Sequence, residues 1–323
     1  MCYLYVTKIG NINMITSIFN KTRPINYIIL FTLLLIFFIL YQNVSFITEI
    51  GVIGWIVKIG SFLLLTASLF LMHFIYNRNN LVKDNMYGAL FSTLFCVLFP
   101  QILDSPKIIC SLFFLVLAFR RLISLRSKLG VKQKIFDSCI FILLATLFYP
   151  LAFLFFGVVF YVIIFQTSFD FRNWLIPFIA FFIIGVIVVL VEMITNSGFV
   201  FTTIDSLSFQ FNFELLKENK LQFLILIFYF SLLLLFLFSS FITFGSRSVN
   251  QHSVYNILYL ILILSIVIFA FEPVPNYALI SYSFFPVVIL GSNMIESIEK
   301  LWIKETFLII ITLLIFILFG FQL

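Results

Sequence analysis

Four ionisable side chains stand out because they lie in or beside long apolar stretches of the chain. Lys58 lies inside an apolar run, Glu192 lies near the end of another, and Glu49 and Glu272 lie in short segments between runs. A charged group inside a lipid bilayer is costly, so such residues are functional candidates by default. A carboxylate can act as a general base, and a lysine can bind a phosphate as a point charge.

The same residues also have structural explanations. The long stem of Lys58 can carry its ammonium group out to the headgroups, and charges between apolar runs mark membrane boundaries. His73 and His252 are the only histidines, which is too few for a multi-histidine iron centre. The four cysteines show no CxxC or Cys–His spacing, so neither a metal site nor a disulfide framework is predicted. The sequence identifies no cofactor.

The composition defines the elements that must position these residues. Charged residues make up 10% of the 323-residue chain and hydrophobic residues 63%, with a mean hydropathy of +1.22. The apolar residues form blocks of about 20, which is the length that spans a bilayer core as a helix. Backbone groups inside lipid must be satisfied within the segment, which favours helices. The sequence therefore predicts an all-α, polytopic transmembrane helical bundle with about 10–11 spans.

The basic residues indicate the orientation of the spans. The stretch Ile135–Gln166 would be about 48 Å long as one helix, too long for one ordinary crossing, and Pro150 interrupts it. With two crossings there, fifteen of the nineteen Lys and Arg residues fall on one side. This positive-inside bias favours eleven spans, a cytoplasmic N-terminus and an outer C-terminus, while a re-entrant or tilted pair at 135–166 stays open. The predicted spans are Pro24–Tyr41, Val52–Tyr76, Asn85–Leu103, Ile108–Leu125, Ile135–Gln166 (one span or two), Trp174–Thr195, Leu221–Phe244, Val254–Phe271, Ala278–Met294 and Thr306–Phe321.

The predicted organisation is a cytoplasmic or interfacial segment, 1–23, followed by a single integral membrane domain, 24–323. Either Met1 or Met14 can be the start of translation, and Met14 opens the more natural beginning. Because the basic residues lie in short loops, the net charge of +6 reflects topology and does not indicate nucleic-acid binding. Asp84 and Asp137 precede or begin predicted spans, so we expect them to cap helix N-termini.

This topology places Glu49, Lys58, Glu192 and Glu272 at or near the outer boundary of the membrane. Such a set can bind a cation or act on a lipid-linked substrate, and scattered interface charges would give the same pattern. On the inner side, the dense basic run from Arg120 to Lys134 would meet anionic headgroups, although a role as a topology anchor already explains it.

Several segments resemble an uncharacterised family of bacterial multi-spanning inner-membrane proteins, some of which carry a carotene-cleaving monooxygenase label. The resemblance rests on "MITSIFNKTRPINYIIL", "FFLVLAFRRLISLRSK", "KIFDSCIFILLATLFYP" and "RNWLIPFIAFFIIG", and it covers most of the chain from Met14. It implies the fold class and the inner (cytoplasmic) membrane but no activity. The histidine count argues against the monooxygenase label.

The chain also distantly resembles GT-C type glycosyltransferases, which use polyprenyl-phosphate sugars. Arg120-Arg121, "FILLATLFYP" and "LAFLFFGVVFYVII" are similar to their basic cytoplasmic turn, short span ending in Lys-Pro and following span. "PNYALISYSFFPVVILG" is similar to their outer Arg-Tyr before a proline-containing span. The chain departs from that pattern, because Tyr149-Pro150 replaces Lys-Pro and no arginine precedes Tyr277.

The GT-C resemblance implies specific roles. Glu49, in the first outer loop, would be the catalytic base, Lys58 would hold the donor phosphate and Tyr277 would orient the substrate. Glu192 and Glu272 complete the predicted substrate-binding set. The implied partners are membrane lipid and a polyprenyl-phosphate-linked substrate, and the sequence names no protein partner.

Two other classes of function stay open. A transporter or flippase would use Lys58 and a carboxylate near a cavity, with helices interrupted at Pro150, Pro177 or Pro286. A non-catalytic scaffold or assembly protein would need neither. An outward cavity containing Glu49 favours the enzyme, a polar pocket at the midplane favours transport, and a lipid-facing bundle without either favours the scaffold.

Overall fold

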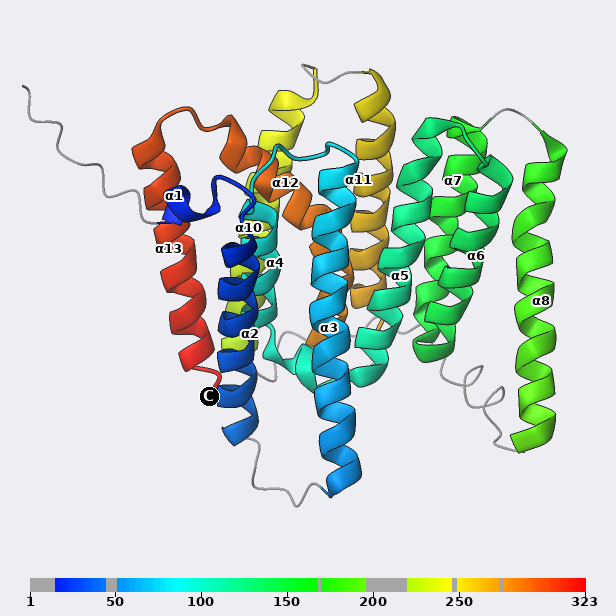
Figure 1. Ribbon diagram of the computed structural model, residues 1–323, viewed down its shortest axis with the longest axis horizontal. Coiled ribbons are helices and arrows are strands. Elements are labelled where there is room, and N and C mark those ends of the chain that lie inside the picture. The colour runs from blue at the N-terminus through cyan, green and yellow to red at the C-terminus, as the bar shows by residue number, and fades with distance from the viewer. Residues whose placement is uncertain (1–14, 45–50, 168–169, 196–219, 246–248, 273–275) are drawn as a thin grey trace, which may run out of the picture.

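The chain folds into a bundle of helices, seen in a computed structural model that describes residues 15–44, 51–167, 170–195, 220–245, 249–272 and 276–323 (Figure 1). Within these ranges all regular structure is helical. The elements are α1 (Ile15–Phe19), α2 (Pro24–Val44), α3 (Val52–Arg78), α4 (Tyr87–Leu98), η1 (Pro100–Asp104), α5 (Pro106–Ser124), η2 (Leu125–Ser127), α6 (Val131–Phe148), η3 (Pro150–Phe155), α7 (Phe156–Gln166), α8 (Phe171–Thr195), α10 (Lys220–Phe244), α11 (Val249–Ala270), η5 (Tyr277–Ser283), α12 (Phe284–Ser297) and α13 (Leu301–Gly320).

Eight helical segments of the described chain are long and apolar enough to cross a membrane. Two shorter apolar segments, Tyr87–Leu98 and Pro150–Gln166, and the more polar α6 run alongside them. The chain passes up and down the bundle, so its start at α1 and its C-terminus lie at opposite ends (Figure 1). The predicted polytopic all-α bundle is therefore confirmed, and α6 and α7 form an antiparallel pair within 135–166.

Prolines produce the breaks between several crossings. Phe99, Ser105 and Tyr149 each precede a proline and have non-helical ψ angles of 71°, 70° and 106°. Proline disfavours a helical residue before it, so the chain leaves the helix at these points. Pro177 and Pro286 instead lie inside the continuous helices α8 and α12, so the interruptions predicted at these two prolines are wrong. The break at Tyr149 lets η3 and α7 turn back along α6, as the sequence predicted for Pro150.

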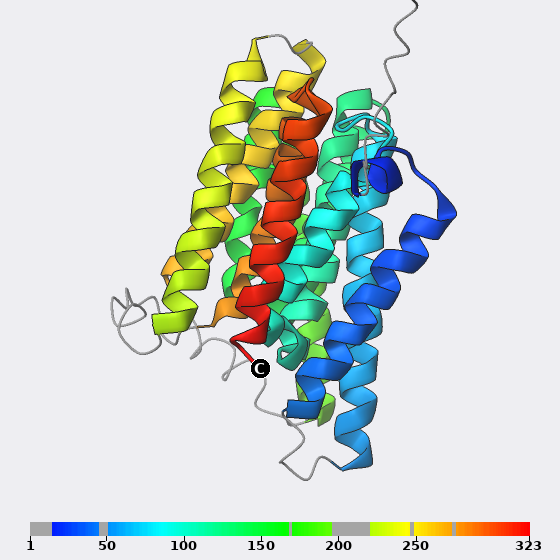
Figure 2. The same ribbon diagram turned by 90° about the vertical axis from the view of Figure 1, so that its left-hand side faces the viewer.

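The core of the bundle is formed by α4 and α12. Every residue of α4 is buried, and α4 packs against α12, α13, α2 and α3. Figure 2 shows α13 and α2 in front of α4 when the bundle is viewed from that side. Glycines permit the close approach, because a Cβ at Gly88 would lie 3.0 Å from the Ser292 hydroxyl oxygen and a Cβ at Gly291 would lie 2.7 Å from the Phe236 ring.

The edge of the bundle carries an exposed apolar surface. Helix α8 packs against α6 and stands at one end of the molecule in Figure 1. Its outward side chains include Phe178, Phe182 and Ile194, all of them exposed. A soluble protein would not leave so continuous an apolar surface in water, so this face of α8 meets lipid.

Two carboxylates predicted to cap helices make other contacts, so that prediction is wrong. Asp84 accepts a hydrogen bond from the Thr22 hydroxyl. At the start of α4, it is Asn85 whose Oδ1 accepts a hydrogen bond from the backbone nitrogen of Tyr87, at 3.2 Å. Helix α6 begins at Val131, well before Asp137. Asp137 therefore lies too far inside the helix to cap it and pairs with Arg121.

Candidate functional sites at the two membrane faces

Lys58 forms part of a polar group at the predicted outer face. Its Nζ lies 3.6 Å from Oδ1 of Asp104, and it also donates a hydrogen bond to Gln42. The Tyr41 hydroxyl donates to Oδ2 of Asp104 at 2.7 Å. We call Tyr41, Gln42, Lys58 and Asp104 the outer polar cluster.

Three elements position the outer polar cluster. Tyr41 and Gln42 lie in the last turns of α2, Lys58 lies near the start of α3, and Asp104 ends η1. Helix η1 contacts both α2 and α3, and the proline-induced bends at each of its ends place Asp104 between them. The Lys58 side chain is 18% exposed and that of Asp104 41% exposed, so the cluster is sheltered yet accessible.

The sequence patterns did not single out Asp104 as a site residue. The feature that could have indicated it is its position, as an acidic residue in the short connection between Pro100 and Pro106, at the same predicted membrane face as Lys58. Hydropathy alone does not show that this connection packs against the start of α3, so the pairing required the structure.

Glu272 takes part in a second polar contact at the same face. The Tyr149 hydroxyl donates a hydrogen bond to the Glu272 carboxylate. Burial raises the pKa of Glu272, and the bond from Tyr149 opposes that rise. Burial, and then the neighbouring carboxylate, raise the pKa of Tyr149 far above its usual range. The Tyr149 ring lies 6.0 Å from that of Tyr282, so the pair adjoins η5.

The structure does not gather the other predicted site residues into one site with Lys58. Tyr277 opens η5, with its ring 6.4 Å from that of Phe269. Glu192 lies on α8, at the edge of the bundle. Lys58 lies near the start of α3, a helix near the middle of the bundle (Figure 1). Glu49 falls within 45–50, outside the described residues. The functional roles of all these residues stay predictions.

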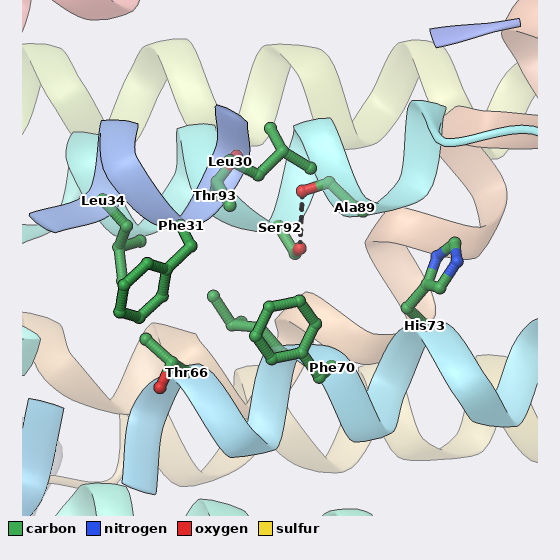
Figure 3. A pocket seen from close by; sticks show the side chains of 10 residues that line it. Leu30, Phe31, Leu34, Thr66, Phe70, His73, Ala89, Ser92 and Thr93 are labelled. Carbon is green, nitrogen blue, oxygen red and sulfur yellow. Dashed lines mark hydrogen bonds between the residues drawn. The ribbon is translucent and has the colours of Figure 1, made fainter. Parts of the chain in front are cut away.

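The inner half of the bundle contains an apolar crevice beside His73. In Figure 3 the side chains of Leu30, Phe31 and Leu34 face those of Thr66 and Phe70 across it. The ring nitrogens of His73 contact the hydroxyl of Tyr76 and the side-chain amide of Asn77. These contacts give His73 a structural role. Within the described part of the chain, no group of three His, Cys, Asp or Glu residues could hold a metal ion.

Two larger hollows lie at the predicted inner face. One, of about 520 Å³, includes Lys83, Asp84 and Glu296 in its lining. The other, of about 500 Å³, lies between the C-terminal ends of α3 and α5 and the start of α6. We call the second the basic hollow, because its lining includes Arg78, Arg120, Arg121, Arg126 and Lys134.

These features define a multi-pass helical membrane protein with polar groups at both faces. A family model described as "Family of unknown function (DUF6427)" matches residues 14–322, so the chain belongs to this family. No curated protein matches the chain, and no solved structure matches it.

Proposed function

We propose that this protein acts on a phosphate-bearing lipid at the outer face of the inner (cytoplasmic) membrane, as a GT-C-like transferase that uses a polyprenyl-phosphate-linked sugar. The observation that supports the proposal is the outer polar cluster, in which an ammonium group and a carboxylate meet at the ends of membrane helices. Ionisable groups at such positions are costly and are retained where they serve a function.

Lys58 is the proposed phosphate ligand. Its neighbours on α3, Ile56 and Ile59, are 65% and 49% exposed, so a prenyl chain can lie along this helix while its phosphate meets the ammonium group. A lysine binds phosphate as a point charge. Asp104 and Gln42 hold the ammonium group in place and are positioning residues in this proposal.

The proposed transfer step uses Glu49 as general base. Glu49 takes the proton of an acceptor hydroxyl, whose oxygen then forms a bond to the anomeric carbon of the sugar. The bond from that carbon to the phosphate oxygen breaks, and the polyprenyl phosphate leaves with the electron pair, its charge stabilised by Lys58. Tyr277 would orient the sugar, and Glu192 and Glu272 complete the proposed substrate-binding residues.

Native mass spectrometry in mild detergent tests the lipid-binding half of the proposal. We expect wild-type protein to retain a polyprenyl phosphate and Lys58→Ala to lose at least about tenfold of its occupancy, because a charge-assisted contact is removed. Lys107→Ala is the matched control, since this exposed lysine lies at the same face outside the cluster. Bulk phospholipid alone, unchanged in Lys58→Ala, would refute the proposal.

A transfer assay separates catalysis from binding. In proteoliposomes supplied with a polyprenyl-phosphate sugar and a hydroxyl acceptor, Glu49→Gln should lower the rate by about 10²–10⁴, the usual contribution of a general base. The variant should still retain the lipid in mass spectrometry. Equal rates for wild type and Glu49→Gln would remove Glu49 from the mechanism.

Transport is the second candidate, because short 3₁₀ segments adjoin several crossings. The segment η1 follows α4, and η3 and η5 lead into α7 and α12, and irregular helix ends supply polar groups in many transporters. In this case Lys58→Ala would slow movement of a fluorescent lipid phosphate between leaflets, and no sugar would be transferred.

A further inference from the structure

The basic hollow concentrates positive charge from four separate elements. Arg78 ends α3, Arg120 and Arg121 lie near the end of α5, Arg126 lies in η2, and Lys134 lies in the first turns of α6. Helices α3 and α5 pack against each other, as do α5 and α6. Packing therefore adds Arg78 to a basic run that the sequence shows only from Arg120 onward.

Three of these cations have no carboxylate partner among the described residues. Arg121 pairs with Asp137, with 3.1 Å between Nε and Oδ2. Lys134 donates 2.7 Å hydrogen bonds to the Ser124 carbonyl and the Ser127 hydroxyl. Throughout the ranges that the structure describes, Arg78, Arg120 and Arg126 form no ion pair. Like charges around one hollow repel each other, so a bound anion would stabilise the arrangement.

An aromatic ring holds two of the unpaired arginines together. The guanidinium carbon of Arg78 lies 5.5 Å from the centroid of the Phe74 ring, and that of Arg120 lies 5.3 Å from it. Cation–π contacts of this length are attractive and restrict the orientation of the guanidinium group. Phe74 thus fixes two planar donor groups, from α3 and α5, next to the same hollow.

The turn between α5 and α6 brings the remaining cations to the hollow. Lys128 and Gly130 have φ angles of 53° and 59°, the left-handed conformation that reverses the chain within a few residues. The bonds from Lys134 to Ser124 and Ser127 tie the start of α6 to the end of α5. The hollow is therefore built by a compact turn.

The chemistry of this lining points to phosphate. Arginine presents a rigid fork of donors that matches phosphate oxygens in pairs. The apolar exposed face of α3 next to the hollow, with Phe70 41% and Phe74 43% exposed, suits an acyl chain. Basic pockets between membrane helices at the cytoplasmic side suit anionic headgroups. We propose that the basic hollow binds the phosphates of an anionic phospholipid headgroup.

Titration of purified protein with cardiolipin, followed by native mass spectrometry, tests this site. The test variant is Arg78→Gln with Arg120→Gln, which removes both guanidinium groups on the Phe74 ring. The matched control is Arg23→Gln with Lys128→Gln, which removes two exposed inner-face charges outside the lining. We expect at least a tenfold loss of cardiolipin affinity in the test variant and less than a twofold loss in the control.

Two further measurements separate the contribution of arginine geometry from that of charge, and a lipid ligand from a free phosphate. Arg78→Lys with Arg120→Lys retains the charge but not the fork, and its affinity should fall between wild type and the glutamine variant; equal melting temperatures show that all variants fold. Pyrophosphate and phosphatidylcholine are titrated in parallel. Pyrophosphate binding that needs the arginines, with cardiolipin no better than phosphatidylcholine, would support a phosphate site and overturn the lipid source. Equal losses in test and control variants would overturn the site. The Lys58 experiment concerns the other face and is independent.

Discussion

The contact between Glu272 and Tyr149 shows how a single carboxylate is used at a helix end. Glu272 follows α11, and Tyr149 lies at the break between α6 and η3. The hydrogen bond joins two crossings that are distant in sequence. Because burial raises the pKa of Glu272 from its ordinary value of 4.5, keeping this carboxylate ionised has an energetic cost in the folded protein.

We predict that Glu272→Gln changes the pH dependence of stability. A carboxyl group whose pKa is higher in the folded state stabilises the protein below the unfolded pKa of 4.5, and this stabilisation is lost as pH rises through the folded pKa. Glutamine cannot ionise, so the melting temperature of the variant relative to wild type should rise from pH 5 to pH 8.

Thermal melting in detergent at both pH values measures this change. Glu299→Gln, which removes an exposed carboxylate at the other face, controls for the loss of one charge. A difference between Glu272→Gln and wild type that is constant with pH, or that falls as pH rises, would contradict the assignment of burial as the dominant effect.

At the scale of elements, α4 lies close against α3 at Gly88. A Cβ at Gly88 would lie 2.5 Å from the hydroxyl oxygen of Tyr76 and 2.7 Å from its ring carbon. Tyr76 is 1% exposed, so its ring has little room to move. We therefore predict that Gly88→Ala destabilises the protein by about 1–3 kcal/mol, the usual effect of overpacking.

The control for this prediction lies on α3 itself. Gly60 has no heavy atom within 4 Å of an added Cβ, so Gly60→Ala should be neutral or stabilising by up to about 1 kcal/mol through helix propensity. Unfolding by SDS in mixed micelles measures both variants. Equal stabilities for the two variants would show that α4 can shift away from Tyr76.

Much of the element layout follows from the sequence because lipid restricts the backbone so strongly. Apolar length places each crossing, and Pro150 places the break between α6 and α7, since the residue before a proline tends to leave the helix. The predicted span Asn85–Leu103 ran past Pro100, whereas α4 ends at Leu98. Side-chain partners do not follow in this way. Lys58 and Asp104 meet because η1 packs between α2 and α3, and Arg78 joins Arg120 at Phe74 because α3 packs on α5. Apolar helix faces with little variation in pattern do not specify such neighbours.

The molecule as a whole is electrically asymmetric. Described lysines and arginines at the predicted outer end are Lys58, Lys107 and Lys220. At the opposite end are Lys21, Arg23, Arg78, Lys83, Arg120, Arg121, Arg126, Lys128, Lys132, Lys134, Arg172, Lys300 and Lys304. Basic loops are retained on the cytoplasmic side during insertion, so this difference predicts the orientation, and with it the side of the membrane on which each proposed site lies.

Cysteine labelling of intact cells tests that orientation. In a variant without the native cysteines, Leu129→Cys lies in the turn between α5 and α6, where Leu129 is 74% exposed, and Lys107→Cys lies exposed at the opposite end. A membrane-impermeant maleimide should label Lys107→Cys in intact cells and Leu129→Cys only after permeabilisation. The reverse labelling pattern would show that the bundle has the inverted topology. The basic hollow would then face outward, away from the cytoplasmic leaflet whose anionic lipids it is proposed to bind. The outer polar cluster would face the cytoplasm, so this measurement tests a premise of both proposals.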